Sequence, residues 1–349
     1  MAFYQCKKCK KIWQYLIEKC PDCFLKLERI LSKKIKVIGV SKVNIPTFFH
    51  PKVPYFVLLL KDENGNRWVQ KSVKEYKIGE EFKIETVSDK GAVAIWRVKY
   101  DILEAIEKVV DLLGGLELKE NYKVLILPTL ISSTHSYFRD NTSPEFLEAT
   151  LRFLFAKGIK PENIKVAAQS FDDIPITVAA QKSGLLNICL ENKVSTLDLA
   201  KTNFVKKAPH QQVGGGLEIS QEVFNSNFIL NLPILKMGKI AASENILKIL
   251  KKDYNSPATL PSKAWAPIIK NLKEFLPEIL TIAEAEVVQK PDKFTIFFGL
   301  ILASFNTLNL DRVFNEISMI KDLPEILREV KIEDIQILGR KIEEVSFRP

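Results

Sequence analysis

The chain has 349 residues, of which 46% are hydrophobic and 27% charged, and this length suits two or three packed domains. No run approaches the about twenty consecutive apolar residues of a membrane-spanning helix, so the composition excludes a helical membrane protein. The formal net charge is +9, and it is unevenly placed: residues 1–100 carry 21 Lys or Arg against 10 Asp or Glu, whereas the remaining residues carry 30 against 32.

Four of the five cysteines lie at the start of the chain, as Cys6-x2-Cys9 and Cys20-x2-Cys23. Two such pairs, separated by ten residues, place four thiolates tetrahedrally around one metal ion. We expect a structural zinc ion, because four thiolates leave no open coordination position, with iron as the alternative. Two disulfides are disfavoured, because no signal peptide is evident and the lysine-rich composition is typical of a cytoplasmic protein. We therefore expect a rubredoxin-like zinc ribbon over residues 1–31 and a cytoplasmic location.

Residues 32–100 have the pattern of a small β-barrel. The segments 35–43 and 67–73 alternate apolar and polar residues, and Asn64-Gly65 is a hairpin turn signal. The other expected strands are 55–60, 82–86 and 92–100. Five short strands in this length favour an OB-like barrel.

The excess of basic residues in this amino-terminal part predicts an anionic partner. Four lysines surround the first cysteine pair: Lys7, Lys8, Lys10 and Lys11. The partner would be nucleic acid, a phosphate-bearing ligand such as coenzyme A, or an acidic protein surface, and a merely solvated lysine face is the alternative. Four aromatic residues of the expected barrel either stack bases or form its core: Tyr55, Phe56, Trp68 and Trp96. Abundant Lys, Glu and Ile with few His and Met is also typical of a thermophilic protein.

The sequence Asp101-Ile-Leu-Glu104 is a capping box, which predicts a linker helix over residues 101–119. From residue 120 to 349, strands and helices alternate, which predicts an α/β domain with a mostly parallel sheet. The expected strands are 123–127, 164–168, 186–190, 227–230, 280–288, 294–302 and 335–338. The expected helices begin after Ser143, at 175, at 240, at 262 and at Asp311.

Four candidate ligand-binding residues follow from this alternation. Lys236 and Lys248 follow a strand end and lie at or within the next helix, where phosphate and carboxylate groups bind; solvated lysines are the alternative. Positions 244 and 248 share one face of that helix. His135 lies in the loop after the first strand of the α/β domain, at the sheet edge where ligands bind, and is a candidate general base or metal ligand. Asp311 is expected to cap the start of its helix, with a ligand-binding role as the alternative.

Residues 1–100 resemble the zinc ribbon plus OB-fold proteins called domain of unknown function family 35. The shared features are the two cysteine pairs, the strand Pro54-Tyr-Phe-Val-Leu-Leu-Leu60, and the turn Ile78-Gly79-Glu80-Glu81-Phe82. Members of that family accompany thiolases and hydroxymethylglutaryl-CoA synthases and are associated with acyl-CoA. The resemblance implies an ancillary protein that docks on a thiolase-like or other CoA-dependent enzyme.

Residues 120–345 resemble domain of unknown function family 362. The family's Lys-Pro-Asn motif corresponds to Leu127-Pro128-Thr129 here, and its two lysines, twelve residues apart, correspond to Lys236 and Lys248. A late aspartate of the family corresponds to Asp311. The ferredoxin-type cluster of some members is not available, because Cys189 is the only cysteine in this part of the chain.

The expected function is that of an ancillary zinc-binding protein that also binds a small anionic ligand in its α/β domain. A nucleic-acid-binding protein that uses the basic ribbon and the OB barrel is one alternative. An enzyme that uses Lys236, Lys248 and Asp311 is another.

Overall fold

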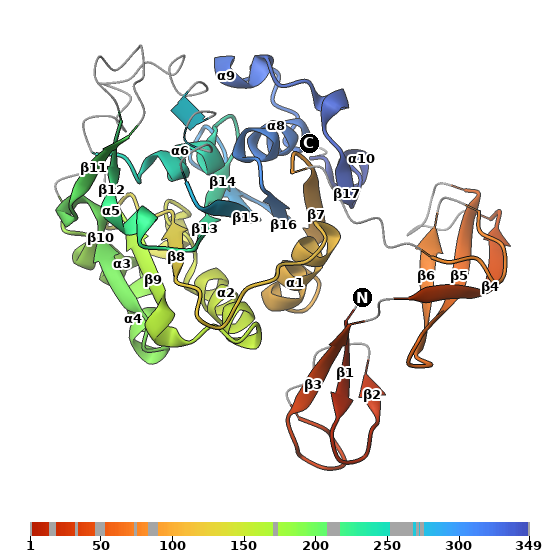
Figure 1. Cartoon of the computed structure of the whole chain (residues 1–349). Coiled ribbons are helices and arrows are strands. Elements are labelled where there is room, and N and C mark those ends of the chain that lie inside the picture. The colour runs from red at the N-terminus through yellow and green to blue at the C-terminus, as the bar shows by residue number, and fades with distance from the viewer. Residues whose placement is uncertain are drawn as a thin grey trace. The chain divides into compact units, whose positions relative to one another are not determined.

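The structure is a computed structural model of the whole chain, and it forms two compact units, residues 1–86 and 87–349 (Figure 1). It describes residues 2–13, 19–31, 34–45, 53–72, 75–82, 90–169, 174–207, 217–251, 268–269, 272 and 276–347. Most of the expected strand 82–86 and of the expected helix beginning at 262 lies outside these residues. Among the described residues, no helix is long and apolar enough to cross a membrane.

The first unit begins with a three-stranded antiparallel sheet that carries the cysteines. Its strands are β1 (Ala2–Cys6), β2 (Ile12–Trp13) and β3 (Leu27–Leu31), in the order β2-β1-β3. The two cysteine pairs lie in turns beside these strands, as a ribbon around a metal requires.

The second sheet of this unit is a three-stranded antiparallel meander. It consists of β4 (Ile35–Val43), β5 (Tyr55–Asp62) and β6 (Arg67–Ser72). Its core is formed by the buried residues Phe3, Ile35, Val37, Phe56, Leu58, Leu60 and Trp68. The aromatic residues Phe56 and Trp68 therefore belong to the core and are not available to stack bases. Closure of this meander into an OB-like barrel stays a prediction.

The second unit is built on one nine-stranded, mostly parallel sheet, as the sequence predicted. Its strand order is β10-β9-β8-β13-β15-β16-β7-β17, and β14 pairs with β15. The five strands from β10 to β15 run parallel, whereas β16 is antiparallel to both of its neighbours. In chain order the strands are β7 (Val93–Arg97), β8 (Val124–Pro128), β9 (Ile164–Ala168), β10 (Ser195–Asp198), β13 (Phe228–Leu232), β14 (Ile234–Lys236), β15 (Glu278–Gln289), β16 (Thr295–Ser304) and β17 (Ile337–Gly339).

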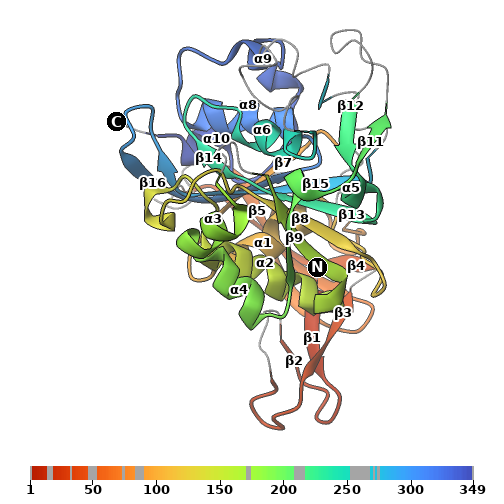
Figure 2. The ribbon, with the colours of Figure 1, turned by 90° about the vertical axis from the view of Figure 1, so that its left-hand side faces the viewer.

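Helices cover both faces of this sheet (Figure 2). The helices on one face are α1 (Ile102–Leu112), α2 (Pro144–Ala156), α3 (Ile176–Ser183) and α4 (Leu185–Glu191), and those on the other include α6 (Ala241–Leu247) and α8 (Thr307–Ile317). The side chains of strand β8 are buried on both faces of the sheet. Val124 and Ile126 pack in the core on the α1–α4 side, whereas Leu125 and Leu127 pack on the α6 side. A continuous apolar strand is needed when both faces are buried. The remaining elements are the antiparallel pair β11 (Phe204–Lys207) and β12 (Leu217–Ser220) and the short helices α5 (Gln221–Phe224), α9 (Glu325–Arg328) and α10 (Ile342–Val345).

Strand β7 lies in the large sheet and not in the amino-terminal barrel where we expected it. It pairs with β16 and β17, and its residues Val93, Ala94 and Ile95 are fully buried, as an interior strand of a covered sheet requires. Helix α1 buries Ile106 and Val109 against the same sheet, so it is part of this unit's core and not a free linker.

The segment expected as a strand at 186–190 is the helix α4. Its burial has a helical period, because Leu185 and Cys189 are buried while Leu190 is exposed. A short apolar run fits a strand or a helix equally well by composition, and packing decided the outcome. Cys189 is a buried small residue of this helix, and burial raises the pKa of its thiol to about 11.

Candidate metal centre and candidate ligand site

Each cysteine pair is held by its own backbone turn, and the two turns have the same hydrogen-bond pattern. The amide of Cys6 donates to the carbonyl of Lys11 at 3.0 Å, and the amide of Lys10 donates back to the carbonyl of Cys6 at 3.0 Å. The second pair repeats this pattern, with the amide of Phe24 donating to the carbonyl of Cys20 at 2.8 Å. Each turn therefore presents its two thiols from a fixed backbone.

Each turn contains one residue with a left-handed backbone conformation, and neither of these residues is a glycine. Lys10 has φ 61° and Phe24 has φ 56°. An L-residue in this conformation costs about 1–2 kcal/mol relative to its usual conformations. The two cysteine turns thus contain local backbone strain.

The four thiols converge as a metal centre. The Sγ atoms of Cys6, Cys9, Cys20 and Cys23 all lie within 4.8 Å of one another, and those of Cys9 and Cys20 are 3.6 Å apart. A tetrahedral site with metal–sulfur bonds of about 2.3 Å has sulfur–sulfur edges of about 3.8 Å. The donor set and its spacing fit one tetrahedral metal ion.

The environments of the free thiols differ. The backbone amide of Cys9 holds the pKa of Cys6 down at about 7, whereas burial raises the pKa of Cys23 to about 12. Because a metal ion binds the thiolates, binding must release protons from the thiols with the higher pKa, and affinity should rise with pH.

Part of the basic charge around the first cysteine pair is already neutralised. Lys7 forms an ion pair with Glu28 and Lys11 with Asp22, each at 2.5 Å. Within the described part of the chain, Lys8 and Lys10 form no such pair, so they carry the cationic character of this turn.

A second candidate site lies where the order of the parallel strands changes direction. From β8 the chain proceeds to β9 on one side, while β13 lies on the other side of β8. In open α/β sheets, ligands bind at the carboxyl ends of the strands at such a point. Here the strand ends are joined to α6 by Asn245, whose amide donates to the carbonyl of Leu127 at 2.7 Å and to Oδ1 of Asn231 at 2.8 Å.

The loop between β8 and α2 is held at this edge by charged contacts. Lys236, the last residue of β14, lies 3.0 Å from Asp140, and Arg139 lies 3.0 Å from the buried Glu284. The other oxygen of Glu284 accepts the backbone amide of Ser143 at 2.9 Å. Burial raises the pKa of the Glu284 carboxyl, so its ionised form depends on these partners.

Lys248 lies in the same charged environment. It follows α6 directly and is only 3% exposed, and burial lowers the pKa of its amino group to about 7. Burial raises the pKa of Glu244, while the nearby charges of Lys239, Lys248 and Lys236 act in the opposite direction. The charges of all three lysines thus act on the Glu244 carboxyl; we call Lys236, Lys239, Glu244 and Lys248 the lysine cluster.

Asp311 lies inside α8, so the prediction that it caps the start of its own helix is wrong. Asn306 is the cap, with its side chain accepting the amide of Asn309. The Asp311 carboxylate instead accepts the backbone amides of Ala242 and Ser243, both at 2.9 Å, and so caps α6. Burial raises the pKa of Asp311 to about 7. Asp311 is thus joined to the lysine cluster through the helix that it anchors.

His135 lies in the loop that carries Arg139 and Asp140, but it is exposed. Its Nδ1 accepts the backbone amide of Tyr137 at 3.1 Å, which caps a short 3-10 helix. Among the described residues, no hydrogen bond or ion pair joins it to Lys236 or Lys248. A ligand role for His135 stays a prediction.

Sequence reasoning missed three residues of this site. The first is Glu244: its i,i+4 spacing from Lys248 places both on one helix face, but Glu244 was not named as a site residue. Asp140 and Asn245 gave no local signal, because their partners lie far away in the sequence.

Residues 124–243 match the family Domain of unknown function (DUF362). This segment contains β8, β13, Lys236 and the start of α6, and the match confirms the resemblance inferred from the sequence. No curated protein matches the chain.

Solved structures also match parts of the chain. An "Ltp2-ChsH2(DUF35) aldolase" matches at 20% identity with a TM-score of 0.20, covering 23% of this chain and 68% of that one. A DUF35 protein of unknown function from Sulfolobus solfataricus matches at 20% identity with a TM-score of 0.18, covering 22% and 62%. The lactate racemase apoprotein from Thermoanaerobacterium thermosaccharolyticum matches at 12% identity with a TM-score of 0.40, covering 67% and 58%. DUF35 proteins, the second family inferred from the sequence, are thus among the matches.

Proposed function

We propose that this chain is an accessory metalloprotein with a structural metal in its amino-terminal unit and an anion-binding site in its α/β unit. The observation that carries the first part is the convergence of four thiols within 4.8 Å. Four protein ligands fill a tetrahedral zinc ion, so the metal organises the ribbon and takes no part in a reaction. Four reduced cysteines need a reducing compartment, and the proposal therefore places the protein in the cytoplasm.

The proposed partner of the metal-held unit is an enzyme of acyl-CoA or thioester metabolism. The support is the resemblance of residues 1–100 to ribbon and OB-fold proteins that accompany such enzymes. The two ion pairs around the first cysteine turn leave Lys8 and Lys10 to meet an acidic or phosphate-bearing surface.

The proposed ligand of the α/β unit is a small anion, a phosphate or a carboxylate. Its support is the lysine cluster, in which the charges of three lysines act on one glutamate, beside the switch point of the sheet. A bound anion would restore the charge of Lys248, because a neighbouring negative group favours the ammonium form. Asp311 positions the helix and does not contact the ligand in this proposal.

Calorimetric titration with phosphate, acetate and coenzyme A tests the anion site. Lys236→Ala should weaken binding of the preferred anion at least tenfold, about 1.5–3 kcal/mol, because a charge-assisted hydrogen bond is lost. Lys182→Ala is the matched control, since it removes an exposed lysine of α3. The anion site is rejected if none of the three probes binds, or if Lys236→Ala and Lys182→Ala bind alike.

A catalytic role for the same cluster is the second candidate function. It is favoured by one observation: burial brings the pKa of both Lys248 and Asp311 to about 7, where a group exchanges protons readily. A folded Lys236→Ala variant that retains full turnover of any reaction found for this chain would eliminate this version.

A further inference from the structure

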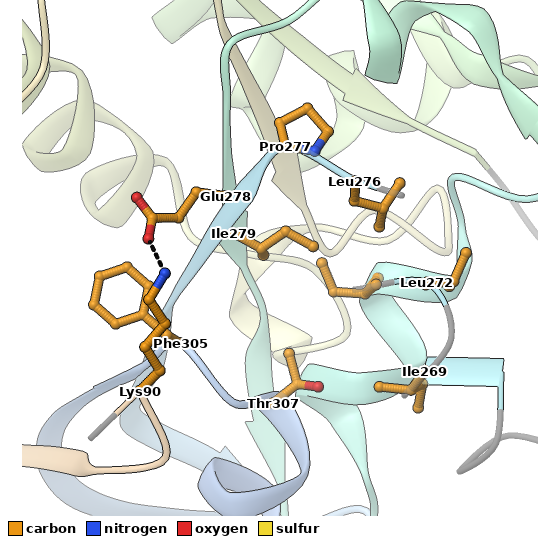
Figure 3. A pocket seen from close by; sticks show the side chains of 10 residues that line it. Lys90, Ile269, Leu272, Leu276, Pro277, Glu278, Ile279, Phe305 and Thr307 are labelled. Carbon is orange, nitrogen blue, oxygen red and sulfur yellow. Dashed lines mark hydrogen bonds and ion pairs between the residues drawn. The ribbon is translucent and has the colours of Figure 1, made fainter. Parts of the chain in front are cut away.

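A cavity of about 290 Å³ lies on the α6 and α8 side of the large sheet, beside the start of β15 (Figure 3). None of the four residues of the lysine cluster lines it. Its apolar lining consists of Ile246, Ile269, Leu272, Leu276, Pro277, Ile279 and Phe305. An apolar, concave space with few polar groups is the usual form of a small-molecule site.

One wall of this cavity is held in place by hydrogen bonds between residues that do not line the cavity. The hydroxyl of Ser304 donates to the carbonyl of Ala92 at 2.7 Å, and the side-chain Nδ2 of Asn309 donates to the carbonyl of Gly91 at 2.7 Å. These bonds fasten the residues before β7 to the end of β16 and to the first turn of α8. The lining residues Lys90 and Thr307, which belong to these two segments, therefore have fixed backbones, and this wall exists without a ligand.

Thr307 lines the cavity, and its buried hydroxyl makes no hydrogen bond to the described residues. The residue is only 4% exposed, and within the described parts of the chain its Oγ1 has no hydrogen-bond partner. Its side chain lines the cavity (Figure 3). Buried hydroxyl groups almost always have a partner, and one without a partner calls for a missing group.

The charged residues of the lining already satisfy each other. Lys90 and Glu278 form an ion pair at 2.9 Å, in which both side chains are largely exposed to solvent. A charged ligand would have to break this pair to gain a counter-charge from the lining. An uncharged ligand could bind without breaking this ion pair.

We propose that this cavity binds a small, uncharged and mainly apolar molecule whose single hydroxyl or carbonyl group bonds to Thr307. An apolar cavity of about 150 Å³ holds one benzene molecule, so this cavity accommodates roughly ten non-hydrogen atoms. The site is independent of the metal centre and of the lysine cluster, and the proposal does not rest on the function proposed for either.

Methyl NMR of the full chain tests the proposal with 1-octanol as the probe and octanoate as its charged counterpart. The δ1 methyls of Ile246, Ile269 and Ile279 should shift saturably with 1-octanol. Thr307→Val, which replaces the hydroxyl by a methyl group, should weaken binding about three- to tenfold, and Thr307→Ser should bind as the unmodified chain does. Leu272→Trp should abolish the shifts by filling the cavity.

Three results would overturn the proposal. The first is the absence of saturable shifts at these methyls. The second is equal affinity of Thr307→Val and Thr307→Ser for 1-octanol. This comparison is valid whether or not Leu272→Trp folds. The third is tighter binding of octanoate than of 1-octanol, which would assign the cavity to carboxylates.

Discussion

Lys248 carries an amino group into a region where water is nearly absent, since only 3% of the residue is exposed. Burial penalises the charged form and lowers the pKa to about 7, from about 10.4 in an unfolded chain. The unfolded chain therefore binds more protons than the folded one between about pH 7 and pH 10, and this lysine makes stability rise with pH across that window.

The first prediction concerns the cost of this burial. Lys248→Met, which keeps the length of the side chain, should raise the free energy of unfolding at pH 7 by about 1–3 kcal/mol. The difference from the unmodified chain should shrink as the pH rises toward 10, because the unfolded lysine then also loses its proton. Urea unfolding at pH 7, 8.5 and 10 measures both effects, with Lys182→Met as the exposed control. A less stable variant, or a difference that does not change with pH, would contradict the account.

The second prediction concerns the left-handed residues of the cysteine turns. Phe24 has φ 56° and is 75% exposed, so its ring contributes little packing while its backbone is strained. Phe24→Gly should be more stable than Phe24→Ala by about 1 kcal/mol, because both lose the ring and only glycine adopts this φ without cost. Thermal unfolding of the metal-loaded ribbon in the two variants measures the difference. Equal stability would show that this turn is not strained.

At the scale of elements, Asp311 connects two helices. It lies in α8 but caps α6 through the amides of Ala242 and Ser243. The third prediction is that Asp311→Ala lowers the free energy of unfolding by about 2–4 kcal/mol, because two buried amides lose their acceptor. Asp311→Asn should cost less, since one acceptor oxygen remains. Urea unfolding measures both, and an Ala variant as stable as the Asn variant would refute the capping role.

The ribbon depends on its metal more than on its core. The fourth prediction is that Cys20→Ser removes about one metal ion per chain and unfolds the first 30 residues, since a ribbon of this size has almost no core. Elemental analysis and limited proteolysis measure the two effects. Cys189→Ala is the control, because Cys189 lies in α4, outside the centre. A Cys20→Ser chain that retained both metal and protease resistance would refute a structural metal.

The elements that could be predicted are those fixed by local chemistry. The cysteine spacing predicted the convergence of four thiols, and Ser143 with Pro144 predicted the start of α2, because a cap and its helix are neighbours in the sequence. The sheet to which strand β7 belongs and the role of Asp311 could not be predicted, because both depend on partners more than sixty residues away. The strand end and the family resemblance located Lys236 and Lys248, but only the fold showed that the charges of both act on Glu244.

At the scale of the whole molecule, the chain combines two compact units with different means of stabilisation. The second unit, residues 87–349, has extensive cores on both faces of its sheet, whereas the first has one small core and the cysteine centre. The amino-terminal unit also carries the basic charge. This division fits a protein whose first unit contacts a partner while the second holds a ligand.

The most direct test of the accessory role is affinity purification of the full chain from its native host, with and without nuclease, beside the Cys20→Ser variant. We expect a CoA-dependent enzyme to co-purify with the unmodified chain, to resist nuclease, and to be lost from the variant. Nucleic acid in the eluate, with partners released by nuclease, would contradict the account and assign the basic amino-terminal unit to nucleic-acid binding.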